Sequence, residues 1–155
     1  MKGNDRIIEK LNDLLSDELT AINQYMLHAE MCDNWKYEVL HKVGEKRAID
    51  EMKHAEKLIA RILFLDGQPV VSNLKKITIG ANVETQHKND HALELMAIKS
   101  YNEGVQLASQ LKDNGTKELL EAILKEEEDH VDVLEAQFAQ IEQMGIQNYL
   151  TQQVG

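Results

Sequence analysis

Apolar residues recur at alternating steps of three and four along most of the chain, the spacing that places them on one face of a helix. This pattern predicts a first helix from Asp5 to about Asn34 and a second from about Tyr37 to Asp66. Gly67 and Pro69 then stop the second helix. The apolar stripe of the first helix consists of Leu11, Leu15, Ile22, Tyr25 and Ala29.

The second half of the chain shows the same helical spacing. A third helix is predicted from about Val83 to Lys112, and a fourth from about Thr116 to Met144 after a tight Asp113-Asn114-Gly115 turn. Gly145 ends the fourth helix, and residues 146–153 suit a short fifth one.

The lengths of the connections predict the topology. Two connections are short, whereas residues 67–82 form a long crossover between the second and third helices. This order specifies two antiparallel helical hairpins lying side by side. We therefore predict an all-α four-helix bundle with a short C-terminal fifth helix, in which residues 1–155 form a single domain.

The inward-facing positions also carry charged residues, in a pattern that occurs twice. In each half a lone Glu precedes a Glu-x-x-His pair, and the spacing between them is identical in the two halves. This spacing lets a helix running out and a helix running back reach the same level, with both members of each pair on one face. Packed face to face, the hairpins would bring four carboxylates and two imidazoles together. Every position recurs at one constant offset along the chain: Glu18, Tyr25, Glu51 and His54 correspond to Glu94, Tyr101, Glu127 and His130.

Such a group is costly inside an apolar core unless its charge is compensated. Two divalent iron ions would supply four positive charges against the four carboxylates, with neutral imidazoles completing the coordination. Oxygen and nitrogen ligands suit iron or manganese better than the thiolates usual in structural zinc sites. The repeat therefore predicts six metal ligands: Glu18, Glu51, His54, Glu94, Glu127 and His130.

Two further Glu-x-x-His pairs lie outside the repeat. They are Glu38 with His41 and Glu84 with His87, near the predicted beginnings of helices. Neither pair has a copy at the offset of the repeat. We therefore expect both on the solvated surface.

Composition and charge restrict the remaining function classes. The formal net charge of −10 disfavours nucleic-acid binding through a basic surface. The amino terminus is polar and Arg61 interrupts the most apolar stretch, so we expect no signal peptide, no membrane span and a cytoplasmic protein. Cys32 is the only cysteine, which excludes an intrachain disulfide and a four-cysteine iron site.

Several segments, taken in order, resemble bacterioferritin over essentially the whole chain. His130 sharpens the resemblance, because ordinary ferritins commonly lack the second Glu-x-x-His. The resemblance implies a ferritin-like fold and a hollow shell of 24 subunits, of one or two types. The similar segments are Met1–Gly3, Glu18–Tyr25, Asp50–Ala55, Arg61–Leu65, Met144–Gly145 and Asn148–Leu150.

The resemblance also implies a ferroxidase reaction. Paired Fe(II) ions would be oxidised by oxygen or hydrogen peroxide, and ferric oxyhydroxide would be stored in the cavity. The ligand set is the one described for ferritin-like di-iron proteins. In that family pattern Glu51 and Glu127 bridge the irons, Glu18 and His54 complete one coordination sphere, and Glu94 and His130 complete the other.

Three further residues gain expected roles from the resemblance. Met52 matches the haem ligand, which two subunits supply across a twofold axis so that two thioether sulfurs bind one haem b. A ferredoxin-type partner would then deliver electrons for iron release. We expect Tyr25 to hydrogen-bond beside the iron site, whereas Tyr101 is chiefly its core-filling copy.

The chain also departs from the family pattern. Many bacterioferritins have a His four residues before Asp50, where this chain has Lys46, so the inner-surface iron site of those relatives is not expected from Asp50 alone. Aromatic residues of some relatives are absent at Leu58 and Val133. Ordinary structural roles are expected for four other residues: hydrogen-bonded or surface histidines at His28 and His91, an inert, partly buried thiol at Cys32, and a subunit contact at Trp35.

Two alternative functions remain at this stage. One is a small rubrerythrin-like di-iron peroxidase or oxidase that stores little iron, although the missing rubredoxin cysteines weigh against it. The other is a metal-free helical scaffold whose carboxylates serve interactions. The sequence leaves open the choice between oxygen and peroxide and the path by which iron reaches the site.

Overall fold

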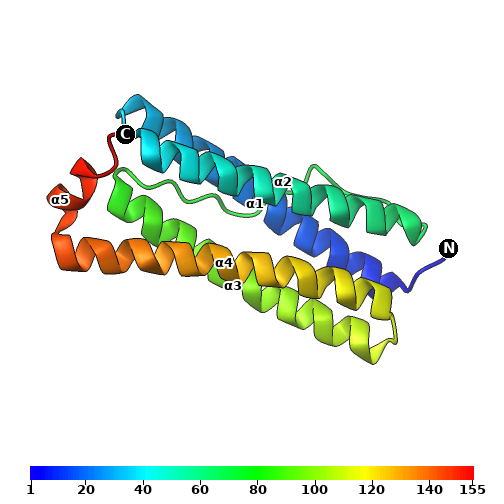
Figure 1. The fold of residues 1–155 in the computed structure, drawn as a ribbon. Coiled ribbons are helices and arrows are strands. Elements are labelled where there is room, and N and C mark those ends of the chain that lie inside the picture. Colours follow the sequence, from blue (N-terminus) through cyan, green and yellow to red (C-terminus); the bar gives the residue numbers. More distant parts are fainter.

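The computed structural model describes all 155 residues and contains five helices and no strand (Figure 1). Figure 1 shows α1 and α2 as one antiparallel pair, α3 and α4 as another, and the crossover running along the bundle. The predicted all-α bundle, its long crossover and its short fifth helix are confirmed. The helices are α1 (Asp5–Asn34), α2 (Glu38–Phe64), α3 (Val83–Gln110), α4 (Asn114–Met144) and α5 (Ile146–Thr151).

Two helices end earlier than predicted because they close in the same hydrogen-bonded turn. At the end of α2, Asp66 has a φ of 58°, and the N–H of Gly67 donates to the carbonyl of Ile62 at 2.9 Å. At the end of α3, Lys112 has a φ of 59°, and the N–H of Asp113 donates to the carbonyl of Ala108 at 2.9 Å. The left-handed residue of this motif is usually glycine, so the sequence did not mark these ends.

The beginning of α4 also differs from the prediction. The predicted turn at residues 113–115 is the first turn of α4, which starts at Asn114 rather than Thr116. The side chain of Asp113 accepts a hydrogen bond from the backbone N–H of Thr116 at 3.0 Å. Asp113 therefore caps the helix and stabilises a turn that the Asn-Gly pair alone would disfavour.

Apolar side chains fill both ends of the bundle and leave its middle to polar residues. The larger cluster lies towards the beginning of α1 and the end of α2, and includes Leu11, Leu58 and Ile62. A smaller cluster closes the opposite end, where α5 places Tyr149 against Leu40. Each fully buried Leu or Ile contributes about 1.5–3 kcal/mol, so these clusters hold the four helices firmly around the polar centre.

Polar side chains spaced one helical turn apart on α1 bind the crossover. The Oγ of Ser16 donates to the carbonyl of Asn73 at 2.8 Å, and the hydroxyl of Thr20 accepts from the N–H of Lys75 at 2.8 Å. One turn further, Gln24 accepts from the N–H of Thr78 at 3.1 Å, and His28 accepts from the N–H of Gly80 at 3.0 Å. Because these bonds satisfy backbone groups of a segment without secondary structure, they fix the crossover along α1.

None of the five helices combines the length and the apolar character required to cross a membrane.

Candidate metal centre

The six predicted ligands lie together at the middle of the bundle, and every long helix contributes at least one. Glu18 comes from α1 and Glu94 from α3, whereas α2 and α4 each contribute a Glu-x-x-His pair. His130 is 9% exposed, and the other five are at most 1% exposed. The sequence repeat therefore identified a real juxtaposition of buried ionisable groups.

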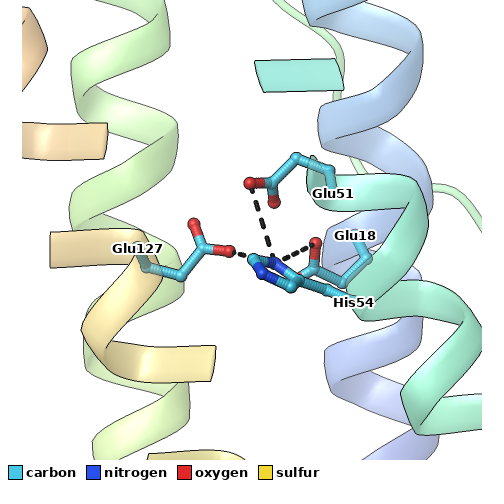
Figure 2. Close-up of side chains that lie close together, drawn as sticks. All are labelled: Glu18, Glu51, His54 and Glu127. Carbon is cyan, nitrogen blue, oxygen red and sulfur yellow. Dashed lines mark ion pairs between the residues drawn. The ribbon is translucent and has the colours of Figure 1, made fainter. Parts of the chain in front are cut away.

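The six residues form two overlapping groups of four. One group consists of Glu18, Glu51, His54 and Glu127, whose ligand atoms lie within 4.8 Å of one another (Figure 2). The other consists of Glu51, Glu94, Glu127 and His130. Because Glu51 and Glu127 belong to both groups, they stand between two neighbouring positions for a cation.

Each imidazole points its Nδ1 atom at the carboxylates. Figure 2 shows the ring of His54 between Glu18, Glu51 and Glu127, with Nδ1 3.6, 3.8 and 2.8 Å from their nearest oxygens. In the second group, Nδ1 of His130 lies 2.9 Å from Glu51 and 3.4 Å from Glu94. Nδ1 of each imidazole therefore faces the centre.

The atoms that face the centre have no hydrogen-bond partner. Nδ1 of His54 and Oε1 of Glu127 are 2.8 Å apart, but they do not align as a hydrogen bond. A buried polar atom without a partner costs about 1–3 kcal/mol, so a cluster of such atoms favours the binding of a cation. The unpartnered atoms are Glu18 Oε2, Glu51 Oε1, His54 Nδ1, Glu94 Oε2, both Glu127 carboxylate oxygens and His130 Nδ1. Their oxygen and nitrogen chemistry fits iron.

The outward-facing atoms of the terminal ligands are satisfied across the bundle. Tyr25 donates its hydroxyl to Oε1 of Glu94 at 2.5 Å, which confirms the predicted hydrogen bond beside the site. Tyr101 donates to Oε1 of Glu18 at the same distance, so it does more than fill the core. Each bond joins α1 to α3 and leaves the second oxygen of the carboxylate directed at the centre.

Two carboxylates that sequence reasoning missed hold the outer nitrogens of the imidazoles. Nε2 of His130 lies 3.0 Å from Oδ2 of Asp50, and Nε2 of His54 contacts Glu126. Such carboxylate–histidine pairs orient metal-ligating imidazoles. The sequence did contain a signal for these two carboxylates, because an acidic residue directly precedes each Glu-x-x-His pair of the repeat.

Burial and the close carboxylates shift the pKa values of three central groups. Burial disfavours a charged imidazole, but the carboxylates of Glu127 and Glu18 outweigh it and raise the pKa of His54 to about 11. The pKa of His130 rises to about 10 because Glu127 and Glu94 outweigh burial in the same way. Burial and the neighbouring Glu127 raise the pKa of Glu94 to about 8. Metal binding at these groups would therefore release protons.

A cavity leads towards the carboxylates from the side of the crossover. Its volume is about 240 Å³, and Glu18, Glu51 and Glu94 line it together with residues of α1 and α3. Lys75 and Lys76 of the exposed crossover also line the cavity. It is large enough for a hydrated ion or a small oxidant to approach the centre.

The prediction for the pairs outside the repeat was partly wrong. Glu38 is exposed, whereas His41 is only partly exposed and its Nδ1 lies 2.9 Å from the carbonyl of Ala29. His87 is 6% exposed and its Nε2 lies 3.0 Å from the hydroxyl of Tyr149. His87 faces the bundle interior, where it lines a small cavity with Val43 and Arg47 of α2. Tyr149 reaches it from α5, which lies across the end of the bundle where α3 begins (Figure 1).

A third acidic group lies on the surface. Glu30, His41 and Glu45 bring ligand atoms within 4.8 Å of one another, but both carboxylates are exposed. Water satisfies exposed carboxylates at little cost. Unlike the central groups, this cluster therefore has no need of a metal ion.

The departures from the family pattern have a clear place in the structure. Lys46 Nζ lies 3.0 Å from Oδ2 of Asp50, the same oxygen that contacts His130. Leu58 is buried in the larger apolar cluster, and Val133 is exposed. Lys46 therefore engages Asp50 directly, at the position where the expected family pattern has a histidine.

The remaining candidates have ordinary surroundings. His28 is buried with Nδ1 2.8 Å from Asp90, and His91 lies 2.9 Å from Glu135 at the surface, as expected. Cys32 is fully rather than partly buried, and burial raises the pKa of its thiol to about 11. Trp35 is partly buried against Tyr37, and its predicted subunit contact stays a prediction.

Met52 lies apart from the metal centre, on an outer face of the bundle. Its side chain is 46% exposed on α2. It borders a groove of about 320 Å³ between α1 and α2, lined mainly by apolar residues: Ile22, Met26, Ala29, Ala48 and Ile49. An exposed thioether beside an apolar groove fits a shared haem ligand.

Comparison with known proteins agrees with this architecture. The family described as "Ferritin-like domain" matches residues 8–144. Bacterioferritin of Brucella melitensis biotype 1 is 39% identical over 149 residues, which cover 96% of this chain and 92% of that protein. Bacterioferritin of Streptomyces coelicolor is 40% identical over 151 residues, or 97% and 90% of the two chains. Bacterioferritin of Mycolicibacterium paratuberculosis is 37% identical over 152 residues, or 98% and 96%. The chain therefore belongs to the bacterioferritins, a branch of the ferritin-like family.

Proposed function

We propose that this protein is a ferroxidase subunit that stores iron, with Fe(II) as the substrate of the buried centre. The main support is the set of unpartnered carboxylate and imidazole atoms that converge between the four helices. The membership of the chain in the bacterioferritins favours the same function. The cavity beside Glu18, Glu51 and Glu94 offers the substrates a path.

The proposed roles follow from which ligands the two groups share. Glu51 and Glu127 would be shared by the two iron positions, because both belong to both groups. Glu18 with His54 then completes one position, and Glu94 with His130 completes the other. Tyr25 assists the second position by holding Glu94.

A pair of irons matches the electron count of the oxidant. Two Fe(II) ions become two Fe(III) ions and release two electrons. Hydrogen peroxide takes up two electrons and two protons to give two water molecules, and oxygen takes up the same number to give hydrogen peroxide. Because both electrons come from one centre, the reduction avoids a free radical product.

We also propose that the subunits assemble into a 24-subunit shell, of one or two subunit types, that encloses the ferric mineral. Large apolar side chains lie exposed on the outside of the isolated subunit, among them Leu63, Phe64 and Leu95. Exposed apolar patches commonly become buried in subunit contacts. The prediction of one domain over residues 1–155 is retained, because all four long helices share the core.

Haem binding at Met52 is proposed on the fit of its surroundings. Met52 would hold the haem through its sulfur, together with the same residue of a second subunit. The apolar groove beside it would receive part of the macrocycle. When bound, the haem would supply a one-electron carrier, for which a ferredoxin-type protein is the proposed partner. A cytoplasmic location is likewise retained as a prediction.

An anaerobic Fe(II) titration of the assembled protein tests the proposed centre. We expect two tightly bound Fe(II) ions per subunit, followed by rapid oxidation when oxygen or peroxide is added. Glu84→Gln provides a matched control, because Glu84 belongs to a Glu-x-x-His pair outside the centre. Fewer than two tight sites in the unmodified protein would refute the paired centre.

The native mass of the assembly separates storage from the alternatives. A shell of 24 subunits is expected for storage, whereas a dimer would favour the rubrerythrin-like peroxidase or the scaffold. The family relationship already disfavours both alternatives.

A further inference from the structure

Both halves of the metal centre carry a buried tyrosine on the terminal carboxylate. Tyr25 in α1 donates to Glu94 in α3, and Tyr101 in α3 donates to Glu18 in α1. The two O–O distances are both 2.5 Å, and the rings are 1% and 0% exposed. The hydroxyl of Tyr101 thus donates to the carboxylate of one iron position, just as the hydroxyl of Tyr25 donates to the carboxylate of the other.

Tyr101 determines which oxygen of Glu18 is free. It is the only hydrogen-bond donor to Glu18, and it occupies Oε1. The other oxygen, Oε2, has no partner and lies 3.6 Å from Nδ1 of His54. A carboxylate held through one oxygen presents the other in a fixed direction.

Filling the core would not require the hydroxyl. The ring of Tyr101 packs in the larger apolar cluster with residues such as Leu14 and Leu120. A phenylalanine would fill nearly the same volume there without burying a polar group. The hydroxyl is therefore accounted for by Glu18 and not by packing.

The surroundings of the two tyrosines differ, although their hydrogen bonds match. The guanidinium of Arg47 lies 5.5 Å from the centre of the Tyr25 ring, and Arg47 pairs with the buried Asp90. Tyr101 instead belongs to the apolar cluster, in which Ile123 occupies the position of the repeat that corresponds to Arg47. Tyr101 is thus not held by an ion pair of the kind that borders Tyr25.

We infer that Tyr101 is a positioning residue that holds Glu18 so that Oε2 binds the metal ion shared with His54. This inference rests on the proposed ferroxidase centre and assigns Tyr101 a role at one of its two metal positions. The metal affinities of the two positions would then depend on different tyrosines: Tyr101 for the Glu18 position and Tyr25 for the Glu94 position.

A Co(II) titration of the assembled protein, followed by visible absorption, tests the inference without the oxidation reaction. The unmodified protein should bind two Co(II) ions per subunit. Tyr101→Phe should lower the affinity for one of the two Co(II) ions by about 10–100-fold, the loss typical when a group that orients a ligand is removed. Tyr25→Phe should instead lower the affinity for the other Co(II) ion. This loss would appear as a different change in the absorption spectrum.

Tyr149→Phe is the matched control. Tyr149 is also buried and hydrogen-bonded, but its partner is His87 at the end of the bundle. Its loss should leave the affinities for both Co(II) ions unchanged. Helix content and native mass are measured for every variant, and Tyr101→Leu serves as a second donor-free variant if Tyr101→Phe fails to assemble.

A double-mutant cycle shows whether Tyr101 acts through Glu18. In a Glu18→Gln background, Tyr101→Phe should cause no further loss of Co(II) affinity. Two Co(II) ions bound by Tyr101→Phe with unchanged affinities and spectra would refute the inference and leave the centre intact. A failure of the unmodified protein to bind two ions would instead overturn the proposed function together with the inference.

Discussion

The Nε2 atom of His130, in α4, lies 3.0 Å from Oδ2 of Asp50, in α2. The contact joins the two hairpins at the edge of the metal centre, and its counterpart joins His54 to Glu126. In each case the outer nitrogen of the imidazole meets a carboxylate from the opposite hairpin, and the inner nitrogen faces the metal ligands. These contacts therefore orient both rings towards the carboxylates of the centre.

This contact predicts the effect of Asp50→Asn. The amide keeps the size of the side chain but removes the charge that orients His130, so affinity at the Glu94 position should fall by about 10–100-fold. The measurement is a Co(II) titration. Lys46→Met is the control, because it removes only the other contact of Asp50, and it should leave the affinity nearly unchanged.

Removing a bridging ligand should have a larger effect. The double variant Glu127→Gln, His130→Ala should lose the rapid phase of paired Fe(II) oxidation while retaining its helix content, because two buried ligands disappear but the apolar clusters remain. Stopped-flow absorption after mixing with oxygen or peroxide measures this phase. Oxidation at the unmodified rate would contradict the assigned centre.

The haem proposal is tested at a residue distant from the six ligands. Met52→Leu keeps the apolar volume on α2 but removes the sulfur, so haem should be lost while the shell assembles normally. Haem absorption and native mass are measured on the same sample. Met26→Leu, in the same groove, should retain haem, and a haem spectrum in Met52→Leu would exclude Met52 as the ligand.

The burial of His87 predicts a pH dependence of stability. Burial, assisted by the positive Arg47, lowers the pKa of His87 from 6.5 to about 4. The other charged or titratable groups near it are Asp90, His28, Cys32 and Tyr149. Below pH 6.5, His87 takes up a proton in the unfolded chain but stays neutral in the folded protein. The contribution of His87 is therefore complete above pH 6.5 and is lost as the pH falls towards 4, by up to about 3 kcal/mol.

His87→Gln should accordingly lose less stability than the unmodified protein between pH 7 and pH 4.5. The free energy of unfolding is measured by urea denaturation at one fixed subunit concentration. His91→Gln is the control, because His91 lies at the surface beside Glu135. Equal pH dependence in His87→Gln and the unmodified protein would show that His87 does not remain neutral in the fold.

The sequence by itself determined the bundle and the six residues that meet at its centre. Helical periodicity is local, so it placed the helices and showed which face each one turns inward. The constant offset of the repeat then selected Glu51 with His54 and Glu127 with His130 from among four Glu-x-x-His pairs, because only these recur at the same level of both hairpins.

Only the tertiary structure decided which atoms support those ligands. The contacts of Tyr101 with Glu18 and of Asp50 with His130 cross from one hairpin to the other. The contact of His87 with Tyr149 joins α3 to α5, two helices that lie far apart along the chain. These contacts depend on how helices pack against one another. A periodic sequence fixes which face of a helix is inward, but not which atom of the opposite helix it will meet.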